Sequence, residues 1–325
     1  MCAVRFIVLG AGAIGGVVGA RLFQHGHEVV LVARGAHLAA VRERGLRLES
    51  PVETVTLPVP VVGHPRDISF RADDVVLLAV KGQHTVEALQ GLLEGGPARL
   101  PVVCAQNGVA NEPTTLRFFP DVYGLSVMLP AAFLEAGTVR AYSSPVTGVL
   151  DIGRWPAGTG PLAEEIAAAF LASGFVAETS DDIAAVKYGK LLSNLGNAIE
   201  AVCGPAARRG HLDALARQEA ETCYRAAGID YVVEDTASRR LELVKPEPLP
   251  SGRRPGASSW QSLERGAGTI ETDYLNGEIV MLGRLHGVPT PVNELLQRTA
   301  ARMSREKRPP GLMSEAVFLA HVHGG

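Results

Sequence analysis

The sequence has few cysteines, few aromatic residues and almost no net charge. Its four cysteines show no C-x-x-C spacing, which predicts reduced thiols in a cytoplasmic protein rather than a disulfide-rich secreted one. Lys and Arg number 31 against 34 Asp and Glu, so the net charge of −3 provides no global field that favours nucleic acid or an anionic membrane. We expect neither partner, and an anionic ligand must be bound by local groups.

Metal-binding and membrane-spanning patterns are also missing. The nine histidines contain no H-E-x-x-H motif, so no metal site is expected. The uncharged stretch 6–20 is interrupted by glycines and is too short to span a bilayer. With 46% hydrophobic and 20% charged residues, the 325-residue chain is instead long enough for two globular domains.

The hydrophobic pattern of the first half predicts a sheet of parallel strands alternating with helices. The expected strands cover 6–9, 28–33, 75–80, 101–105 and 122–128, and helices are expected at 17–24, 84–93 and 112–119. Short alternating segments over 132–155 predict antiparallel strands at the sheet edge. A helix over 162–173 and a strand over 175–179 complete this part.

Strand patterns are missing after residue 180. Helices are expected at 182–203, 212–227, 232–244, 270–286 and 291–304, and the proline-rich segment 245–256 is expected to be a loop, either a lid or slack. The predicted fold class is therefore α/β, with a Rossmann-type, mostly parallel sheet in a first domain (1–180) and an all-helical second domain (181–325). The apolar faces of such packed helices are compatible with a homodimer.

A glycine-rich turn follows the first predicted strand and precedes a helix. It consists of Gly10, Ala11, Gly12, Ala13, Ile14 and Gly15. In this context the G-x-G-x-x-G spacing predicts a dinucleotide cofactor, because the glycines let the backbone approach a pyrophosphate and the helix N-terminus stabilises its charge.

Three polar residues follow later strands of the predicted sheet. Arg34 stands where an NAD site usually has an acidic residue, so it favours a ribose 2′-phosphate and hence NADP, and Lys81 at another strand end strengthens this preference. Either side chain is otherwise a solvated surface residue. Asn107 precedes a glycine and is either a plain turn residue or a contact to the nicotinamide ribose or the substrate.

Polar residues on the helix 182–203 form a candidate reacting centre. Lys190, Asn194 and Asn197 fall within about 60° of one helix face. A lysine beside a ketone oxygen stabilises developing negative charge and donates a proton, whereas a solvated amphipathic helix has the same spacing. Lys187, one turn earlier, is expected to be solvated.

A second cluster follows the proline-rich loop. Ser258 and Ser259 either cap the next helix or bind a substrate carboxylate. Glu271 near a helix start is favoured by the helix dipole even without a function. Spacing leaves both alternatives open.

Together these motifs resemble the ketopantoate reductase (2-dehydropantoate 2-reductase) family over nearly the whole chain. The matching strings are GAGAIG, VKGQ, QNG, KLLSN, SSWQS, IETDYLNGEI and HGVPTPVN. The resemblance implies Lys190 as general acid, Asn194 as a contact to the substrate hydroxyl or keto group, Glu271 as an anchor for substrate and ribose, and Ser259 with Ser258 as the carboxylate binder. It further implies Arg34 and Lys81 as 2′-phosphate contacts, Asn107 as a cofactor and substrate contact, and Ala132 as a backbone contact to the nicotinamide end.

Two departures from the family pattern surround the substrate. An asparagine usually lies eight residues after the lysine, where this chain has Ala198, with Asn197 one position earlier, and Gly256 replaces a polar residue before the serines. The expected function is NADPH-dependent reduction of 2-dehydropantoate to pantoate between the two domains. The alternatives are reduction of another small 2-keto acid or ketone, and a non-catalytic NADP-binding sensor.

Overall fold

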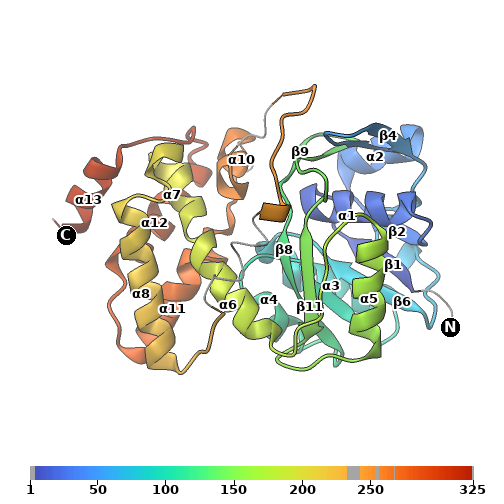
Figure 1. The fold of residues 1–325 in the computed structure, drawn as a ribbon, viewed down its shortest axis with the longest axis horizontal. Helices are drawn as coiled ribbons and strands as arrows, with labels where there is room; N and C mark the ends of the chain where they lie inside the picture. The colour runs from blue at the N-terminus through green and yellow to red at the C-terminus, as the bar shows by residue number, and fades with distance from the viewer. Residues whose placement is uncertain (1–3, 233–241, 253–255, 267, 324–325) are drawn as a thin grey trace. The chain divides into compact units, whose positions relative to one another are not determined.

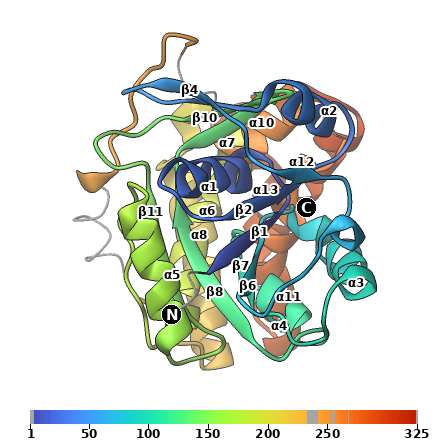
Figure 2. The same cartoon turned by 90° about the vertical axis from the view of Figure 1, so that its right-hand side faces the viewer.

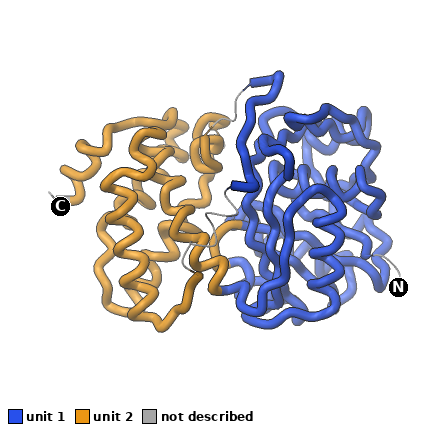
Figure 3. Tube along the Cα trace, in the orientation of Figure 1, with its two compact units in different colours: residues 1–106, 111–184, 233–254 blue, residues 107–110, 185–232, 255–325 orange. Residues whose placement is uncertain are grey.

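The computed structural model describes residues 4–232, 242–252, 256–266 and 268–323. They form two compact units, coloured separately in Figure 3. Unit 1 holds the described residues of 1–106, 111–184 and 233–254, and unit 2 holds those of 107–110, 185–232 and 255–325. The chain thus passes between the units several times, whereas the sequence predicted a single boundary near residue 180.

Unit 1 is built on a seven-stranded sheet (Figures 1 and 2). Its strands are β1 (Arg5–Leu9), β2 (Val29–Val32), β5 (Val61–Val62), β6 (Asp74–Leu78), β7 (Val102–Cys104), β8 (Val122–Met128) and β11 (Val149–Arg154). Their order is β11-β8-β7-β6-β1-β2-β5, and all neighbours are parallel except β8 and β11. The predicted parallel sheet is confirmed, and its topological switch point lies between β1 and β6.

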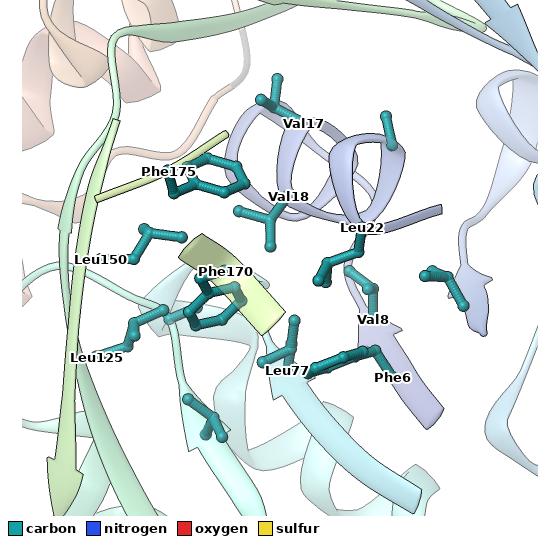
Figure 4. Packing of buried hydrophobic residues seen from close by; sticks show 14 of the residues in the cluster. Phe6, Val8, Val17, Val18, Leu22, Leu77, Leu125, Leu150, Phe170 and Phe175 are labelled. Carbon is teal, nitrogen blue, oxygen red and sulfur yellow. The ribbon is translucent and has the colours of Figure 1, made fainter. Parts of the chain in front are cut away.

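Alternate residues of β1 belong to the cores on the two sides of this sheet. Phe6 and Val8 belong to a cluster that includes residues of helices α1 (Ala13–Gln24) and α5 (Pro161–Ala172), as Figure 4 shows. Ile7 and Leu9 belong to another cluster with residues of helix α3 (Thr85–Gly95). Burial on both faces explains the continuously apolar strands in the sequence.

A second, four-stranded sheet in unit 1 was not predicted. It contains β3 (Leu46–Glu49), β4 (Thr54–Leu57), β9 (Ala131–Glu135) and β10 (Thr138–Ala141) in the order β4-β3-β10-β9. Of the antiparallel strands expected at the edge of the main sheet, only β11 lies there, because β9 and β10 pair with β3 instead. The strand expected at 175–179 is reduced to isolated pairings of Val176 with Val149 and Thr179 with Ile152.

Residues 245–252 of the proline-rich segment belong to unit 1 and pair with the end of β10. The Glu247 amide donates to the Tyr142 carbonyl at 2.7 Å, and Pro246 forms a bridge with Ser143. Leu249 is buried with Tyr142. Residues 253–255 of the predicted loop and residues 233–241 of the predicted helix 232–244 lie outside the described residues.

Unit 2 is helical in its described parts, in agreement with the sequence. It contains most of α6 (Ile183–Asn194), together with α7 (Gly196–Cys203), α8 (His211–Ala227), α10 (Ser258–Glu264), the 3-10 helix η4 (Glu271–Tyr274), α11 (Asn276–His286), α12 (Pro291–Arg305) and α13 (Glu315–His323). Helix α7 packs against α10 and α12, and α11 packs against α8 and α12. No helix in the described ranges is long and apolar enough to cross a membrane.

One of the two long predicted helices is continuous and the other is interrupted. The helix expected over 182–203 comprises α6 and α7, which Leu195 joins with a helical φ of −56° and ψ of −36°, and the Leu195 amide donates to the Leu191 carbonyl at 3.1 Å. The helix expected over 270–286 starts as η4 and breaks at Leu275, whose φ of −118° and ψ of −88° are not helical. The apolar spacing of this second segment continues across the break, so periodicity did not reveal it.

Candidate active site

The glycine-rich turn joins β1 to α1 at the switch point of the main sheet. Gly10 has a φ of +107°, and a Cβ there would lie 2.8 Å from the Val80 nitrogen, so only glycine fits. A Cβ on Gly15 would lie 2.9 Å from Val8 Cγ1. Close packing therefore holds the turn tightly against β1 and the end of β6.

The space in front of this turn suits an anion. A Cβ on Gly12, the N-cap of α1, would meet nothing within 4 Å, and the first turn of the helix has neither an acidic residue nor a capping side chain. Ala11 is buried, whereas Ala13 and Ile14, which begin α1, are partly exposed. The residues present therefore fit the pyrophosphate of a nicotinamide dinucleotide.

Arg34 follows β2 and is the N-cap of helix α2 (Gly35–Arg44). Its side chain is 64% exposed, and Nη1 donates to Glu87 Oε1 at 2.6 Å. This hydrogen bond and the arginine charge hold the pKa of Glu87, in the first turn of α3, below its usual value. The sequence pointed to Arg34 but not to Glu87, because their pairing depends on the placement of two different helices.

The other two predicted cofactor contacts of unit 1 lie on different elements. Lys81 is partly buried and precedes a 3-10 turn, three residues after the end of β6. Ala132 lies on β9 of the second sheet, where it pairs with Arg140 and is buried with Tyr142.

In unit 2, Lys190 lies on α6 between two side-chain amides. Its Nζ donates to Asn107 Oδ1 at 2.5 Å and to Asn194 Oδ1 at 3.5 Å. The structure thus brings Asn107, which the sequence named separately, to the pair of Lys190 and Asn194.

Asn194 contributes a second donor to this cluster. The residue is only 9% exposed, and its buried Nδ2 has no hydrogen-bond partner among the described residues. A buried N–H group without an acceptor is costly, so such groups in folded proteins usually have a partner. An oxygen atom of a ligand would satisfy it.

Asn197 and the two serines form a neighbouring group where α7 meets α10. Asn197 Nδ2 donates to Ser258 Oγ at 3.5 Å across the two helices. Ser259 is 2% exposed. Asn197 lies on α7, which follows α6 after the helical residue Leu195, in agreement with the single helix predicted to carry Lys190, Asn194 and Asn197.

Glu271 is the first residue of η4 and is partly exposed. The turn that contains Asn107 lies against this element, because a Cβ on Gly108 would be 2.6 Å from the Tyr274 carbonyl oxygen. Gly108 has a φ of +79°, which also favours glycine.

Sequence reasoning missed Glu200 and misjudged Lys187. Glu200 on α7 accepts from the Ala257 amide at 2.8 Å and from Arg208 Nη1 at 2.7 Å. An acidic residue within the apolar run 198–202 was the signal that could have revealed it. Lys187 is only 3% exposed, so its predicted solvation is wrong: it lies one turn from the buried Ile183 and Leu191 on the same side of α6.

Comparison with known proteins covers both units. The family model "Ketopantoate reductase PanE/ApbA" matches residues 6–157, and its C-terminal counterpart matches residues 182–304. The curated 2-dehydropantoate 2-reductase of Archaeoglobus fulgidus is 31% identical over 298 residues, which cover 90% of this chain and 95% of that protein.

Solved structures share the fold of the whole chain. The PanE/ApbA family ketopantoate reductase of Ralstonia eutropha JMP134 superposes with a TM-score of 0.78 at 28% identity, covering 93% of this chain and 99% of that one. A D-mandelate dehydrogenase in complex with NADH and anilino(oxo)acetate gives a TM-score of 0.80 at 23% identity, with the same coverage. This second likeness bears on the fold alone.

Proposed function

Because the chain belongs to the ketopantoate reductase PanE/ApbA family, a family of nicotinamide-dependent oxidoreductases, we propose that it reduces 2-dehydropantoate to pantoate with NADPH. The observation that carries the proposal is the cluster around Lys190, whose Nζ donates to two amide oxygens beside the buried Nδ2 of Asn194, which has no partner in the described part of the chain. These groups offer two donors to one carbonyl.

Lys190 is the general acid in this proposal. When bound, the reduced cofactor supplies the hydride that the carbonyl carbon accepts. Lys190 Nζ donates a proton to the carbonyl oxygen, so the ketone becomes a hydroxyl group and the lysine is left neutral. Asn107 and Asn194 accept hydrogen bonds from the lysine ammonium and so orient it for this proton donation.

The other residues of unit 2 orient the substrate. Asn194 Nδ2 donates to the keto oxygen or to the hydroxyl group, since it is buried and has no acceptor among the described residues. The hydroxyl groups of Ser258 and Ser259 donate to the carboxylate, and Asn197 supports Ser258. Glu271 anchors the substrate and the cofactor ribose, as the family resemblance implies.

Unit 1 holds the cofactor in this proposal. The glycine-rich turn binds the pyrophosphate, while Arg34 and Lys81 bind the 2′-phosphate that distinguishes NADPH from NADH. Ala132 contacts the nicotinamide end through its backbone. The exposed ion pair between Arg34 and Glu87 has to open for this, which solvent and a doubly charged phosphate make easy.

A steady-state assay of NADPH oxidation over a panel of 2-keto acids and simple ketones tests the proposal. We expect the highest kcat/KM for 2-dehydropantoate. Activity on another substrate but none on 2-dehydropantoate would identify a reductase of a different keto acid. The buried Ala198, at a position where the family usually has an asparagine, favours this alternative. NADPH binding without turnover of any substrate would identify a non-catalytic sensor.

A further inference from the structure

Glu200 joins the two helices that carry the substrate-binding asparagine and serines. It lies on α7 one turn after Asn197, is 6% exposed, and accepts from the Ala257 amide at the start of α10. We propose that Glu200 and Arg208 are a positioning pair that fixes Ser258 and Ser259 for the substrate carboxylate. The inference rests on the proposed function and identifies residues that act through these serines.

The start of α10 is built around the Glu200 carboxylate. The N-cap Ala257 has no side chain that can cap the helix, and Glu200 Oε1 takes its backbone N–H at 2.8 Å. A Cβ on Gly256 would collide with the same oxygen and would lie 2.7 Å from Trp260 Cγ. The observed position of the Glu200 carboxylate therefore requires glycine at position 256.

Two side chains of α7 form hydrogen bonds with the start of α10. Asn197 Nδ2 bonds the Ser258 hydroxyl, and Glu200 bonds the residue before that serine. Loss of the Glu200 contact would leave α7 joined to the start of α10 through the long hydrogen bond from Asn197, because the bond from Gln261 Nε2 to the Gly256 carbonyl lies within the α10 segment itself. The serine hydroxyls would then spend less time in the orientation that binds the carboxylate.

Arg208 neutralises the charge of the buried Glu200 carboxylate, which would otherwise lie near an anionic substrate. A lone negative charge next to Ser258 would repel the substrate carboxylate. Arg208 Nη1 donates to Glu200 Oε2 at 2.7 Å, so the pair is neutral overall. Removal of the arginine leaves the glutamate charge uncompensated, whereas removal of the glutamate leaves the serines unanchored.

Substitution of Glu200 separates positioning from catalysis. We expect Glu200→Ala to raise KM for the keto acid about tenfold with kcat within about threefold of wild type, because Lys190 is untouched. Glu200→Gln keeps an acceptor for the Ala257 amide, so its KM should rise less than that of Glu200→Ala. NADPH affinity should stay constant in both variants.

Glu315→Gln is the matched control. Glu315 accepts from the Leu212 amide at 2.6 Å and so caps α8, a helix that carries none of the predicted site residues. This variant keeps an acceptor for the Leu212 amide, as Glu200→Gln does for the Ala257 amide, and should leave KM unchanged. An unchanged KM in Glu200→Ala, or an equal rise of KM in Glu315→Gln, would overturn the positioning role.

The charge argument has its own test in Arg208. Arg208→Gln should raise KM for a 2-keto acid about tenfold but should raise KM for the corresponding neutral 2-keto amide by less than about twofold. Arg208→Lys keeps the positive charge and should restore a KM for the acid near that of the wild type. Equal effects on acid and amide would contradict charge compensation.

Trp260 fluorescence distinguishes failure of this inference from failure of the proposed function. Trp155 and Trp260 are the two tryptophans, so a Trp155→Phe background reports on α10 alone. Glu200→Ala should increase acrylamide quenching of Trp260, and Glu315→Gln should not. A wild-type protein inactive on every keto acid would refute the proposed function, whereas unchanged quenching in Glu200→Ala would refute the anchoring of α10.

Discussion

In the proposed mechanism, the lysine that protonates the substrate has to hold its ammonium group in a fixed orientation. Asn107 and Asn194 would hold Lys190 in this way, with their Oδ1 atoms at 2.5 Å and 3.5 Å from Nζ. Arginine at the same position would keep the charge but would not release a proton, because its pKa is far above neutrality. Charge stabilisation and proton donation are therefore separable at this residue.

We expect Lys190→Ala to lower kcat by about 10²–10⁴-fold with NADPH affinity nearly unchanged. Lys190→Arg should also fall well below wild type, since it supplies charge alone. Stopped-flow measurement of NADPH oxidation and a separate NADPH titration give the two quantities. Wild-type turnover in Lys190→Arg would contradict the role as proton donor.

In the proposed mechanism, Asn194 contributes more to function than to stability. Its Nδ2 is buried without an acceptor among the described residues, so deleting it would remove a cost of folding as well as the proposed donor to the substrate. Asn194→Ala should lower kcat/KM by about 10–100-fold and change the free energy of unfolding by less than about 1 kcal/mol. Urea denaturation without ligands, beside steady-state kinetics, checks this. A large loss of stability with unchanged kcat/KM would show that the amide is structural.

At the scale of elements, one carboxylate ties the second sheet to the described part of the proline-rich segment. Glu49 on β3 accepts from Ser251 and from Arg140 of β10, each at 2.7 Å, and from Arg47 at 3.0 Å. Burial raises the pKa of Glu49, but these three hydrogen bonds lower it by a larger amount, so that the pKa falls to about 2. The folded state therefore prefers the ionised carboxylate.

Glu49→Gln should lower the stability of unit 1 in a pH-dependent way. The ordinary pKa of 4.5 falls to about 2 on folding, so the charge contributes fully above pH 4.5 and its contribution is lost as the pH falls toward 2. We expect a cost of about 1–2 kcal/mol at pH 7 that shrinks below about pH 4, measured by urea denaturation. Glu135→Gln is the control, because Glu135 meets the same Arg140 only at 3.6 Å and is largely exposed. A cost that is constant with pH would contradict the argument.

At the scale of the whole molecule, the sequence predicted the features that depend on residues close to one another along the chain. Continuous apolar runs such as Phe6–Leu9 identified the main sheet, and the lysine-asparagine spacing identified Lys190 and Asn194 as neighbours. The second sheet escaped because Glu49 and Arg140, 91 positions apart, meet only through tertiary structure. Period and composition contain no information on such pairings.

The site shows the same division between local and long-range information. Glu200 contacts Ala257, 57 positions later, so its part in the start of α10 depends on the packing of α7 against α10. Arg34 was found from its place after β2, but its partner Glu87 lies 53 positions away. Residues on one helix face were found, whereas their partners from other segments were not.

Cofactor preference is measurable as stabilisation of the whole protein. A ligand that binds only the folded state raises the free energy of unfolding by RT ln(1 + [L]/Kd), so the melting temperature reports its affinity. Arg34 and Glu87 are both largely exposed, and in the proposed NADPH complex their ion pair would compete with the 2′-phosphate for the same guanidinium group. Glu87 would also place a negative charge beside that phosphate.

Arg34→Ala should therefore reduce the rise in melting temperature produced by NADPH and leave the effect of NADH nearly unchanged, corresponding to a loss of NADPH affinity of about 10–100-fold. Glu87→Gln should act in the opposite direction and tighten NADPH several-fold, because it frees the arginine and removes the repulsion. Equal loss of both cofactors in Arg34→Ala would show that the residue does not read the 2′-phosphate. Weaker NADPH binding in Glu87→Gln would mean instead that Glu87 holds Arg34 in the conformation that binds the phosphate.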